Sequence, residues 1–284
     1  MDDVGAAPSR RSGVGGLVAL YGEAFALLGR RPALRRSLIR WLIIGFVFTE
    51  AYAVGIAQLV SGRAALLAAL GAVLWWLFFG LVLVGGATLL FIHPDGPRID
   101  YYGIPNGLTA LRAWSCLPLL LTAALPLPGD LGLTLWCSIG GPLAMLDAVD
   151  GWIARRIGPL TELGRALDPA GDALFFAMAA VGGALVGILP WWLCGLIVLR
   201  YVGPLLATPV VFLSHRRPVL SHTHWGRRNT IAVGWVFFIL MWVRIAHGPV
   251  DTAALVLGIP LVGGTLVPYV VDLVRRIREA PVVP

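Results

Sequence analysis

Long apolar runs alternate with short polar or proline-containing breaks along almost the whole chain. Each run has the roughly 20 residues that an α-helix needs to cross the hydrocarbon core of a bilayer. The pattern predicts eight membrane-spanning helices, at residues 38–60, 64–92, 107–126, 131–153, 169–189, 190–213, 230–247 and 252–274. The second span is expected to tilt or kink at Gly85-Gly86. Residues 16–28 form a candidate interfacial helix before the first span.

The composition supports a membrane protein and excludes two other classes of protein. Hydrophobic residues are 58% and charged residues 13% of the 284 residues, whereas an ordinary soluble chain has about 25% charge. A surface that faces water on all sides needs more charge, and a disordered chain needs lower hydrophobicity. All 22 basic residues are arginine, and the net charge is +7. The arginine excess expected on the cytoplasmic side of a membrane explains this charge without a nucleic-acid partner.

The arginines also predict the orientation in the membrane. Clusters of arginine precede the first span, separate the fourth from the fifth and the sixth from the seventh, and follow the eighth. The alternate connections hold few arginines, so both ends and the arginine-rich loops are predicted to face the cytoplasm. We therefore expect a multi-pass protein of the inner (cytoplasmic) cell membrane, with no cleaved signal peptide.

The breaker cluster from His93 to Pro97 divides the predicted spans into two groups. Residues 1–93 hold the first two spans and the possible interfacial helix, and residues 100–284 hold the other six spans. The candidate chemistry lies entirely in the second group.

Four aspartates stand at the ends of the fourth and fifth spans: Asp147, Asp150, Asp168 and Asp172. A single ionisable residue at bilayer depth costs about 2.5–3.5 kcal/mol on insertion scales, so four of them require compensation. Residues three or four apart share a helix face, which gives one stripe of carboxylates on each of the two helices. The connection between the helices is short, so they are expected to be antiparallel neighbours whose carboxylates converge.

A divalent cation would compensate these charges, because converging carboxylates otherwise repel one another. Hard oxygen ligands suit Mg²⁺ or Mn²⁺. Gly151 and Ala154 leave room for a ligand beside the first pair, and Arg155 and Arg156 add positive charge for a phosphate. An isolated aspartate at a helix end is more often a cap, and Asp168 before Pro169 could act as one.

The spacing D-x-x-D-G-x-x-A-R-x(8)-G-x-x-x-D-x-x-x-D resembles the signature of the CDP-alcohol phosphotransferases, also called CDP-alcohol phosphatidyltransferases. Its fixed positions are filled by Asp147, Asp150, Gly151, Ala154, Arg155, Gly164, Asp168 and Asp172. The resemblance covers about residues 104–278 and is nearest to the phosphatidylglycerophosphate/cardiolipin synthase-like branch. It implies an all-α, six-helix catalytic membrane core, which in this chain is preceded by two extra transmembrane helices.

The resemblance also implies the reaction. A phosphatidyl group would pass from a CDP-linked donor such as CDP-diacylglycerol to an alcohol, with release of CMP, in phospholipid biosynthesis. Carried over by position, two Mg²⁺ or Mn²⁺ ions would be held by Asp147, Asp150, Asp168 and Asp172. Asp172 would also be the base that takes the proton of the acceptor hydroxyl. Nucleotide contacts would come from Asp147, Gly151, Ala154 and Arg155.

The segment from Ile104 to Arg112 is similar to the P-N-x-x-T-x-x-R entry to the first core helix of the family. This similarity adds Asn106 and Thr109 to the implied nucleotide site. An ordinary helix start, with proline in the breaker and asparagine at the cap, is the alternative interpretation.

The acceptor is implied by arginines. The segment from Gly226 to Thr230 resembles the G-K-x-x-T segment of the phosphatidylglycerophosphate synthase branch, with Arg227 replacing lysine. Arg200, inside the sixth span, and Arg227 and Arg228 at its rim suit an anionic acceptor such as glycerol 3-phosphate or the phosphatidylglycerol headgroup. The positive-inside rule explains the rim equally well. Pairing with an aspartate would explain Arg200, and Tyr201 stands where that branch commonly has an acidic residue.

Other interpretations stay open at this point. Within the family, inositol phosphate or another polar alcohol is an alternative acceptor. Outside it, a membrane scaffold or ion transporter is an alternative, because intramembrane aspartates also mark ion pathways. Gly183 and Gly187 have the small-xxx-small spacing of closely packed or dimerising helices. The expected partners are the lipid donor, the alcohol acceptor, membrane lipids and a second copy of the chain, with no nucleic acid.

Overall fold

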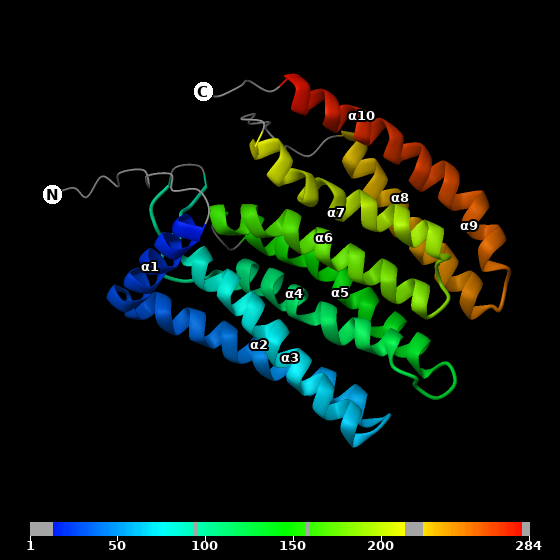
Figure 1. The fold of residues 1–284 in the computed structure, drawn as a ribbon, viewed down its shortest axis with the longest axis horizontal. Coiled ribbons are helices and arrows are strands. Elements are labelled where there is room, and N and C mark those ends of the chain that lie inside the picture. Colours follow the sequence, from blue (N-terminus) through cyan, green and yellow to red (C-terminus); the bar gives the residue numbers. More distant parts are fainter. Residues whose placement is uncertain (1–13, 94–95, 157–159, 214–223, 280–284) are drawn as a thin grey trace.

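A computed structural model describes residues 14–93, 96–156, 160–213 and 224–279. These residues form an all-α bundle whose helices run side by side, which confirms the predicted fold class (Figure 1). The helices are α1 (Val14–Arg30), α2 (Pro32–Gln58), α3 (Gly62–Gly86), α4 (Gly103–Ala124), α5 (Leu131–Arg156), α6 (Glu162–Leu185), α7 (Trp191–Leu213), α8 (His224–Ile245), α9 (Val250–Gly258) and α10 (Gly264–Glu279). A 3₁₀ turn, η1 (Ala87–Leu89), follows α3, and a π-helical segment, η2 (Ile259–Gly263), joins α9 to α10.

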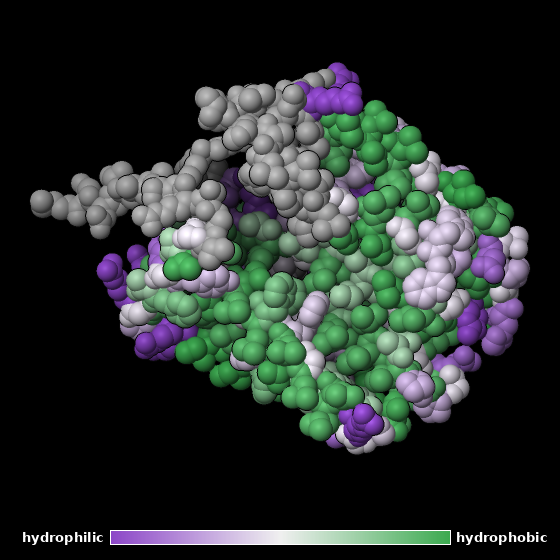
Figure 2. Space-filling view, in the orientation of Figure 1, coloured by the Kyte–Doolittle hydropathy of each residue, from purple (hydrophilic) through white to green (hydrophobic). Residues whose placement is uncertain are grey.

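Five of the predicted spans coincide with helices that are long and apolar enough to cross a membrane, and these helices fit a multi-pass membrane protein. They are Pro32–Gln58, Gly62–Leu89, Gly103–Ala124, Trp225–Ile245 and Val250–Arg276. Shorter apolar stretches, Leu131–Met145 and Trp191–Pro204, lie within α5 and α7. The first half of α6 carries several charged residues, and its crossing stays a prediction. Hydrophobic side chains cover the middle of the molecular face, and hydrophilic ones gather toward its ends (Figure 2).

Several helix boundaries differ from the predicted ones, and the largest difference is at α6. This helix begins at Glu162 rather than at residue 169, because the Thr161 hydroxyl caps it by accepting a hydrogen bond from the Gly164 amide at 3.0 Å. Asp168 therefore lies inside the helix and is not its cap, and Pro169 is accommodated without ending it. The helix α3 ends at Gly86, where the sequence predicted a kink.

The helix α2 packs against α4 through two reciprocal contacts between a tryptophan ring and a glycine. A Cβ atom on Gly107 of α4 would lie 2.0 Å from the Trp41 ring of α2. A Cβ atom on Gly45 of α2 would lie 2.3 Å from the Trp114 ring of α4. These distances are far below van der Waals contact, so only glycine allows the rings to lie against the backbones. The predicted division into residues 1–93 and 100–284 stays a prediction, but the two parts share a closely packed interface.

The helix α4 lies at the centre of the N-terminal half and packs extensively against α2, α5 and α6. By contrast, α5 and α6 approach each other over only a short stretch of the described residues. The sequence predicted that α5 and α6 would be direct neighbours because their connection is short. Among the described residues, α4 packs more extensively against each of the two helices than they pack against each other: Gly140 of α5 faces Leu119 of α4 at 3.4 Å, and Gly171 of α6 faces Thr109 at 3.6 Å, measured from a constructed Cβ. The side chains at the motif end of α5 lie outside the described residues, so the direct approach of the two motif stripes stays a prediction.

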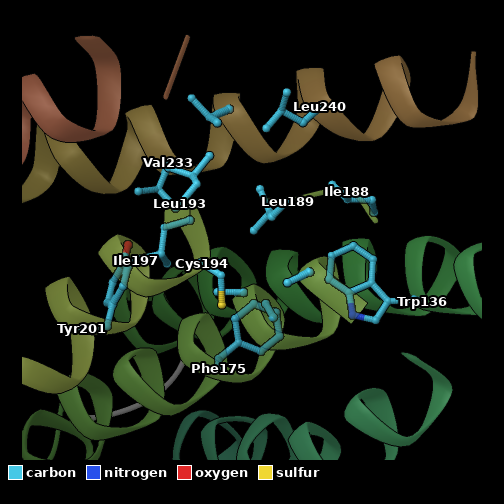
Figure 3. Packing of buried hydrophobic residues seen from close by; sticks show 14 of the residues in the cluster. Trp136, Phe175, Ile188, Leu189, Leu193, Cys194, Ile197, Tyr201, Val233 and Leu240 are labelled. Carbon is cyan, nitrogen blue, oxygen red and sulfur yellow. The ribbon is translucent and has the colours of Figure 1, made fainter. Parts of the chain in front are cut away.

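The second half of the bundle is built around α7. Leu193 and Ile197 of α7 are fully buried between Phe175 of α6 and Val233 and Leu240 of α8 (Figure 3). This cluster holds the C-terminal helices to α6, and so it fixes where the later arginines stand relative to the aspartates.

The Gly183 and Gly187 pair does not form one face of a helix, because α6 ends at Leu185. Gly187 lies in the following turn with φ of 76°, a conformation that favours glycine. A Cβ atom on Gly183 would lie 3.1 Å from the Phe237 ring of the same chain. Gly183 thus packs within the chain, and a homodimer through this pair has no support here.

Candidate active site

The aspartates of the second motif helix share one face of α6. Gly164, Asp168 and Asp172 are spaced by four residues on a continuous helix, so they form the stripe that the sequence predicted. Asp168 is exposed, and the Asp172 side chain is 30% exposed. On α5 the backbone carries Asp147, Asp150, Gly151, Ala154 and Arg155 in helical register. The side chains of these five residues lie outside what the structure describes, so the convergence of the four carboxylates stays a prediction.

A buried arginine of α4 holds one of these carboxylates. The guanidinium of Arg112 donates a hydrogen bond to Asp172 Oδ1 at 2.6 Å, and the Arg112 side chain is only 2% exposed. The Arg112 Cζ atom also lies 5.7 Å from the centroid of the Phe175 ring, within cation–π range. Gly171 lies beside this ion pair, and a Cβ atom built on it would lie 3.5 Å from Arg112 Nη2, an ordinary van der Waals contact. The carboxylate of Asp172 is thereby held in a fixed orientation.

Asn106, which was predicted to bind the nucleotide, connects the start of α4 with the start of α6. Its amide Nδ2 donates to the Tyr102 carbonyl at 2.7 Å and to Thr161 Oγ1 at 3.1 Å. A Cβ atom on Gly164 would lie 2.9 Å from Asn106 Oδ1, so the motif glycine makes room for this side chain. Asn106 is 4% exposed, and its contacts in this structure are with the protein itself, so its contact with a nucleotide stays a prediction.

Thr109, the other predicted nucleotide residue, stands one turn along α4 from Asn106. Its hydroxyl donates to the Pro105 carbonyl at 3.1 Å, and the residue is 5% exposed. Thr109 and Arg112 are three residues apart, so they share the face of α4 that meets α6.

The loop after α3 pairs with the residues just before α6. The His93 amide donates to the Leu160 carbonyl at 2.7 Å, and the Glu162 amide donates to the Phe91 carbonyl at 3.0 Å. The His93 ring also hydrogen-bonds the Glu162 carboxylate, and Arg165 Nη1 lies 3.3 Å from His93 Nδ1. The start of α6, and with it the register of the aspartate stripe, is therefore tied to the N-terminal part of the chain.

The predicted acceptor residues meet where α7, α8 and α10 come together. The Arg200 Cζ atom lies 3.7 Å from the centroid of the Tyr269 ring, and its Nη2 atom donates to the Gly226 carbonyl at 3.4 Å. Among the side chains that the structure describes, none is a carboxylate paired with Arg200, so the aspartate pair considered from the sequence is not found there. Arg227 and Arg228 are exposed at the start of α8.

Tyr201 stands where the branch resembled by the sequence commonly has an acidic residue, and its contacts account for the difference. Its ring stacks on Phe176 of α6 with 4.2 Å between centroids, and its hydroxyl donates to Thr230 Oγ1 of α8 at 3.2 Å. This residue links three helices around the site, a packing role that an aspartate could not fill.

The residues that would hold metal ions fit such ions in chemistry and spacing. Asp168 and Asp172 put two carboxylates on one helix face, and carboxylate oxygens are the ligands that Mg²⁺ and Mn²⁺ prefer. Within the described residues, no three His, Cys, Asp or Glu side chains lie close enough together to hold a metal ion. The side chains of Asp147 and Asp150, which belong to the predicted ligand set, lie outside the described residues.

The structure adds Arg112 to the site; from the sequence, this residue was named only as part of a motif. Arg112 ends the P-N-x-x-T-x-x-R pattern, and sequence reasoning gave it no role of its own. The signal was an arginine inside an apolar span, which is costly unless a carboxylate pairs with it.

This geometry defines an integral membrane protein with a polar site, built from buried arginine, carboxylates and amides, at one end of a helical bundle. The family comparison identifies the class. The chain belongs to the CDP-alcohol phosphatidyltransferase family, whose model matches residues 102–263, more than half of the chain.

Two groups of relatives agree with the predicted branch. The chain is 30% identical over 137 residues to a probable phosphatidylglycerophosphate synthase of Mycobacterium tuberculosis, a match that covers 47% of this chain and 61% of that protein. It is 30% identical over 204 residues to a cardiolipin synthase (CMP-forming) of Streptomyces coelicolor, covering 65% of this chain and 94% of that protein. The chain thus spans about three fifths of the length of the mycobacterial relative. No solved structure matches the chain significantly.

Proposed function

We propose that the protein is an integral membrane phosphatidyltransferase that moves a phosphatidyl group from a CDP-linked lipid to an anionic glycerol-type alcohol and releases CMP. Family membership, together with the complete aspartate motif, carries this proposal. The names of the relatives, phosphatidylglycerophosphate synthase and cardiolipin synthase, support a role in phospholipid biosynthesis.

In this proposal the chain positions two substrates and removes one proton. Asp172, oriented by Arg112, takes the proton of the acceptor hydroxyl as general base. Asn106 and Thr109 on α4, with Asp147, Gly151, Ala154 and Arg155 on α5, bind the cytidine nucleotide. Asp147, Asp150, Asp168 and Asp172 would hold two Mg²⁺ or Mn²⁺ ions, which would supply neutralising charge for the pyrophosphate. The family generally uses divalent metals, which supports this assignment.

Arg200 supports an anionic acceptor. Its guanidinium contacts a tyrosine ring and one carbonyl, with no carboxylate partner among the described side chains. Its charge is therefore available to a phosphate, with which arginine forms strong charge-assisted hydrogen bonds. Arg227 and Arg228 would add electrostatic attraction at the exposed rim. Glycerol 3-phosphate and the phosphatidylglycerol headgroup both carry the required phosphate.

The test is an acceptor panel. Purified protein is supplied with CDP-diacylglycerol, Mg²⁺ or Mn²⁺, and glycerol 3-phosphate, phosphatidylglycerol, inositol phosphate or inositol, while CMP release is measured. We expect CMP release with glycerol 3-phosphate or with phosphatidylglycerol. Release only with an inositol compound would overturn the acceptor assignment. Absence of release with every acceptor, while a related synthase is active in the same assay, would overturn the reaction.

We further propose that the site faces the cytoplasm in the inner membrane, because the arginines near the starts of α2, α6 and α8 lie at the same end of the bundle as the site (Figure 1). A cysteine introduced at Asp130, at the opposite end, should react with a membrane-impermeant thiol reagent in spheroplasts. A cysteine introduced at Arg165 should react only after lysis, and the reverse pattern would overturn this orientation. Assembly into a homodimer stays a prediction that size measurement in detergent would check.

A further inference from the structure

An apolar cavity of about 260 Å³ lies between α3, α4 and α6, beside the aspartate stripe. Its walls are Phe78, Phe79, Val82 and Leu83 of α3, Thr109, Ala110 and Ala113 of α4, and Leu167, Ala170, Gly171 and Leu174 of α6. Among the described residues of this lining, Thr109 alone has a polar side chain, and its hydroxyl donates to the Pro105 carbonyl. The described lining is therefore almost entirely apolar and suits a hydrocarbon.

Two helices are shared between this cavity and the polar site. On α6 the lining residue Gly171 adjoins Asp172, and the lining residue Leu167 adjoins Asp168. On α4, Thr109 belongs to both the cavity and the predicted nucleotide site. An apolar face and a polar face thus stand next to each other on the same two helices. A molecule with a polar headgroup and a hydrocarbon chain could occupy both at once.

The lining of the cavity follows α6 and includes an exposed residue of α3. From Leu167 to Leu174 the lining covers two turns of α6, about 10 Å at 1.5 Å rise per residue. Phe78, also a lining residue, is 57% exposed on a helix that is apolar enough to cross a membrane. Small residues on the opposite walls, Ala110, Ala113 and Ala170, create the space.

We propose that this groove binds an acyl chain of the CDP-linked lipid donor, and that the extra helix α3 exists in this chain to supply one wall of it. The inference rests on the proposed function and adds the part of the site that recognises lipid. The donor is favoured over other lipids because the groove borders Thr109 and the aspartates, which the proposed function assigns to the nucleotide and its pyrophosphate. The acceptor arginine, Arg200, stands on α7, which supplies no residue of the groove.

Narrowing the groove from α3 tests the proposal without touching the polar site. The substitution Val82→Phe fills the cavity, and Leu81→Phe is the matched control, since the neighbouring Leu81 is 51% exposed and outside the lining. Two donors are compared, CDP-dioleoylglycerol and its dihexanoyl analogue. We expect Val82→Phe to raise the KM for the oleoyl donor about tenfold or more, because apolar pockets discriminate chain size by such factors. The KM for the hexanoyl donor should change much less, and Leu81→Phe should behave as the unchanged protein.

A second measurement does not depend on turnover. CDP-diacylglycerol with a diazirine in the middle of one acyl chain is bound to the full protein and photolysed, and the labelled peptides are identified. Labelling of residues 78–83, removed by excess unlabelled CDP-diacylglycerol and by Val82→Phe, supports the proposal. Labelling elsewhere, labelling that excess diacylglycerol without a nucleotide removes equally well, or equal KM changes for both donors would overturn it. Labelling of the groove, combined with no release of CMP from the donor in the presence of any acceptor, would instead overturn only the proposed reaction.

Discussion

Arg112 on α4 and Arg200 on α7 both lie inside apolar helices near the polar end of the bundle, but their charges are satisfied in different ways. Arg112 is almost fully buried and is paired with the carboxylate of Asp172 at 2.6 Å. Arg200 packs its guanidinium on the Tyr269 ring and makes one long hydrogen bond to a carbonyl. The first arrangement neutralises a charge and fixes a carboxylate. The second leaves a positive charge in place, which is what recognition of an anion requires.

The comparison implies that Arg112 contributes to the stability of the fold and to catalysis, whereas Arg200 contributes to the binding of one substrate. Loss of Arg112 should disturb the fold and the catalytic carboxylate, because a buried ion pair with one partner removed leaves an uncompensated charge. Loss of Arg200 should leave the fold intact and weaken the binding of one substrate. Four substitutions test this distinction, and they are described in order of decreasing effect.

The substitution Asp172→Asn removes the carboxylate that Arg112 holds, at nearly constant size. We expect turnover to fall by about 10²–10⁴-fold, the usual contribution of a general base. Cytidine nucleotide binding should be largely retained, as measured by calorimetry with CMP and Mg²⁺. Asp130→Asn at the other end of the bundle is the control and should be fully active. Near-normal CMP release by the Asp172 variant would remove its assigned role.

The substitution Arg112→Ala leaves Asp172 without its partner. Removing one member of a buried pair costs about 3–5 kcal/mol, and the 30% exposure of the Asp172 side chain favours the lower end. The apparent melting temperature in detergent should fall clearly. Arg276→Ala breaks a half-exposed pair with Asp272 at 3.3 Å, and such pairs contribute less than about 1 kcal/mol. Equal falls in melting temperature for both variants would show that the buried Arg112–Asp172 pair stabilises the fold no more than the partly exposed Arg276–Asp272 pair does.

The substitution Arg200→Gln should raise the KM for the anionic acceptor by about ten- to a hundredfold, since a hydrogen bond to a charged group contributes roughly 1.5–3 kcal/mol. The KM for the donor and the melting temperature should change little. Arg244→Gln is the control, because Arg244 pairs loosely with Asp130 at 3.7 Å far from the site. An equal rise in donor KM would show that Arg200 does not discriminate between the substrates.

The substitution Arg228→Gln should have the smallest effect. The Arg228 side chain is exposed and lies over the Trp225 ring, with 5.0 Å between Cζ and the centroid. Exposed charges contribute about 0–1 kcal/mol and are screened by salt, so the acceptor KM should rise by less than about fivefold at low ionic strength. The difference from the unchanged protein should vanish at high salt. A salt-independent loss as large as that of Arg200→Gln would assign Arg228 a direct contact.

Helix existence and the candidate motif could be predicted from the sequence because both depend on local spacing. Apolar runs of sufficient length gave the spans, and positions four apart gave the stripe of Asp168 and Asp172. The start of α6 was missed because Asp168-Pro169 has the local pattern of a helix start. The true start depends on Thr161, whose hydroxyl has to be held in place by Asn106 from a distant helix.

The partners of Arg112 and Arg200 could not be predicted either, because they too depend on contacts between distant helices. Which side chain Arg112 meets depends on how α4 and α6 approach each other, and that approach is set by contacts between residues far apart in the sequence, such as Gly171 and Thr109. A short connection between α5 and α6 suggested direct contact, yet in the described residues α4 packs more extensively against each of them. Tertiary packing overrides such local inferences.

Two backbone hydrogen bonds, from the Glu162 amide to the Phe91 carbonyl and from the His93 amide to the Leu160 carbonyl, also have a consequence for the order of assembly. Polypeptides are synthesised from the N-terminus, and segments that emerge first fold or insert first. The α2–α3 hairpin and its following loop would then be in the membrane before α6 is made. They present two backbone groups against which the start of α6 is aligned when it arrives. The aspartate stripe thus acquires its register from a part of the chain that contributes none of the aspartates.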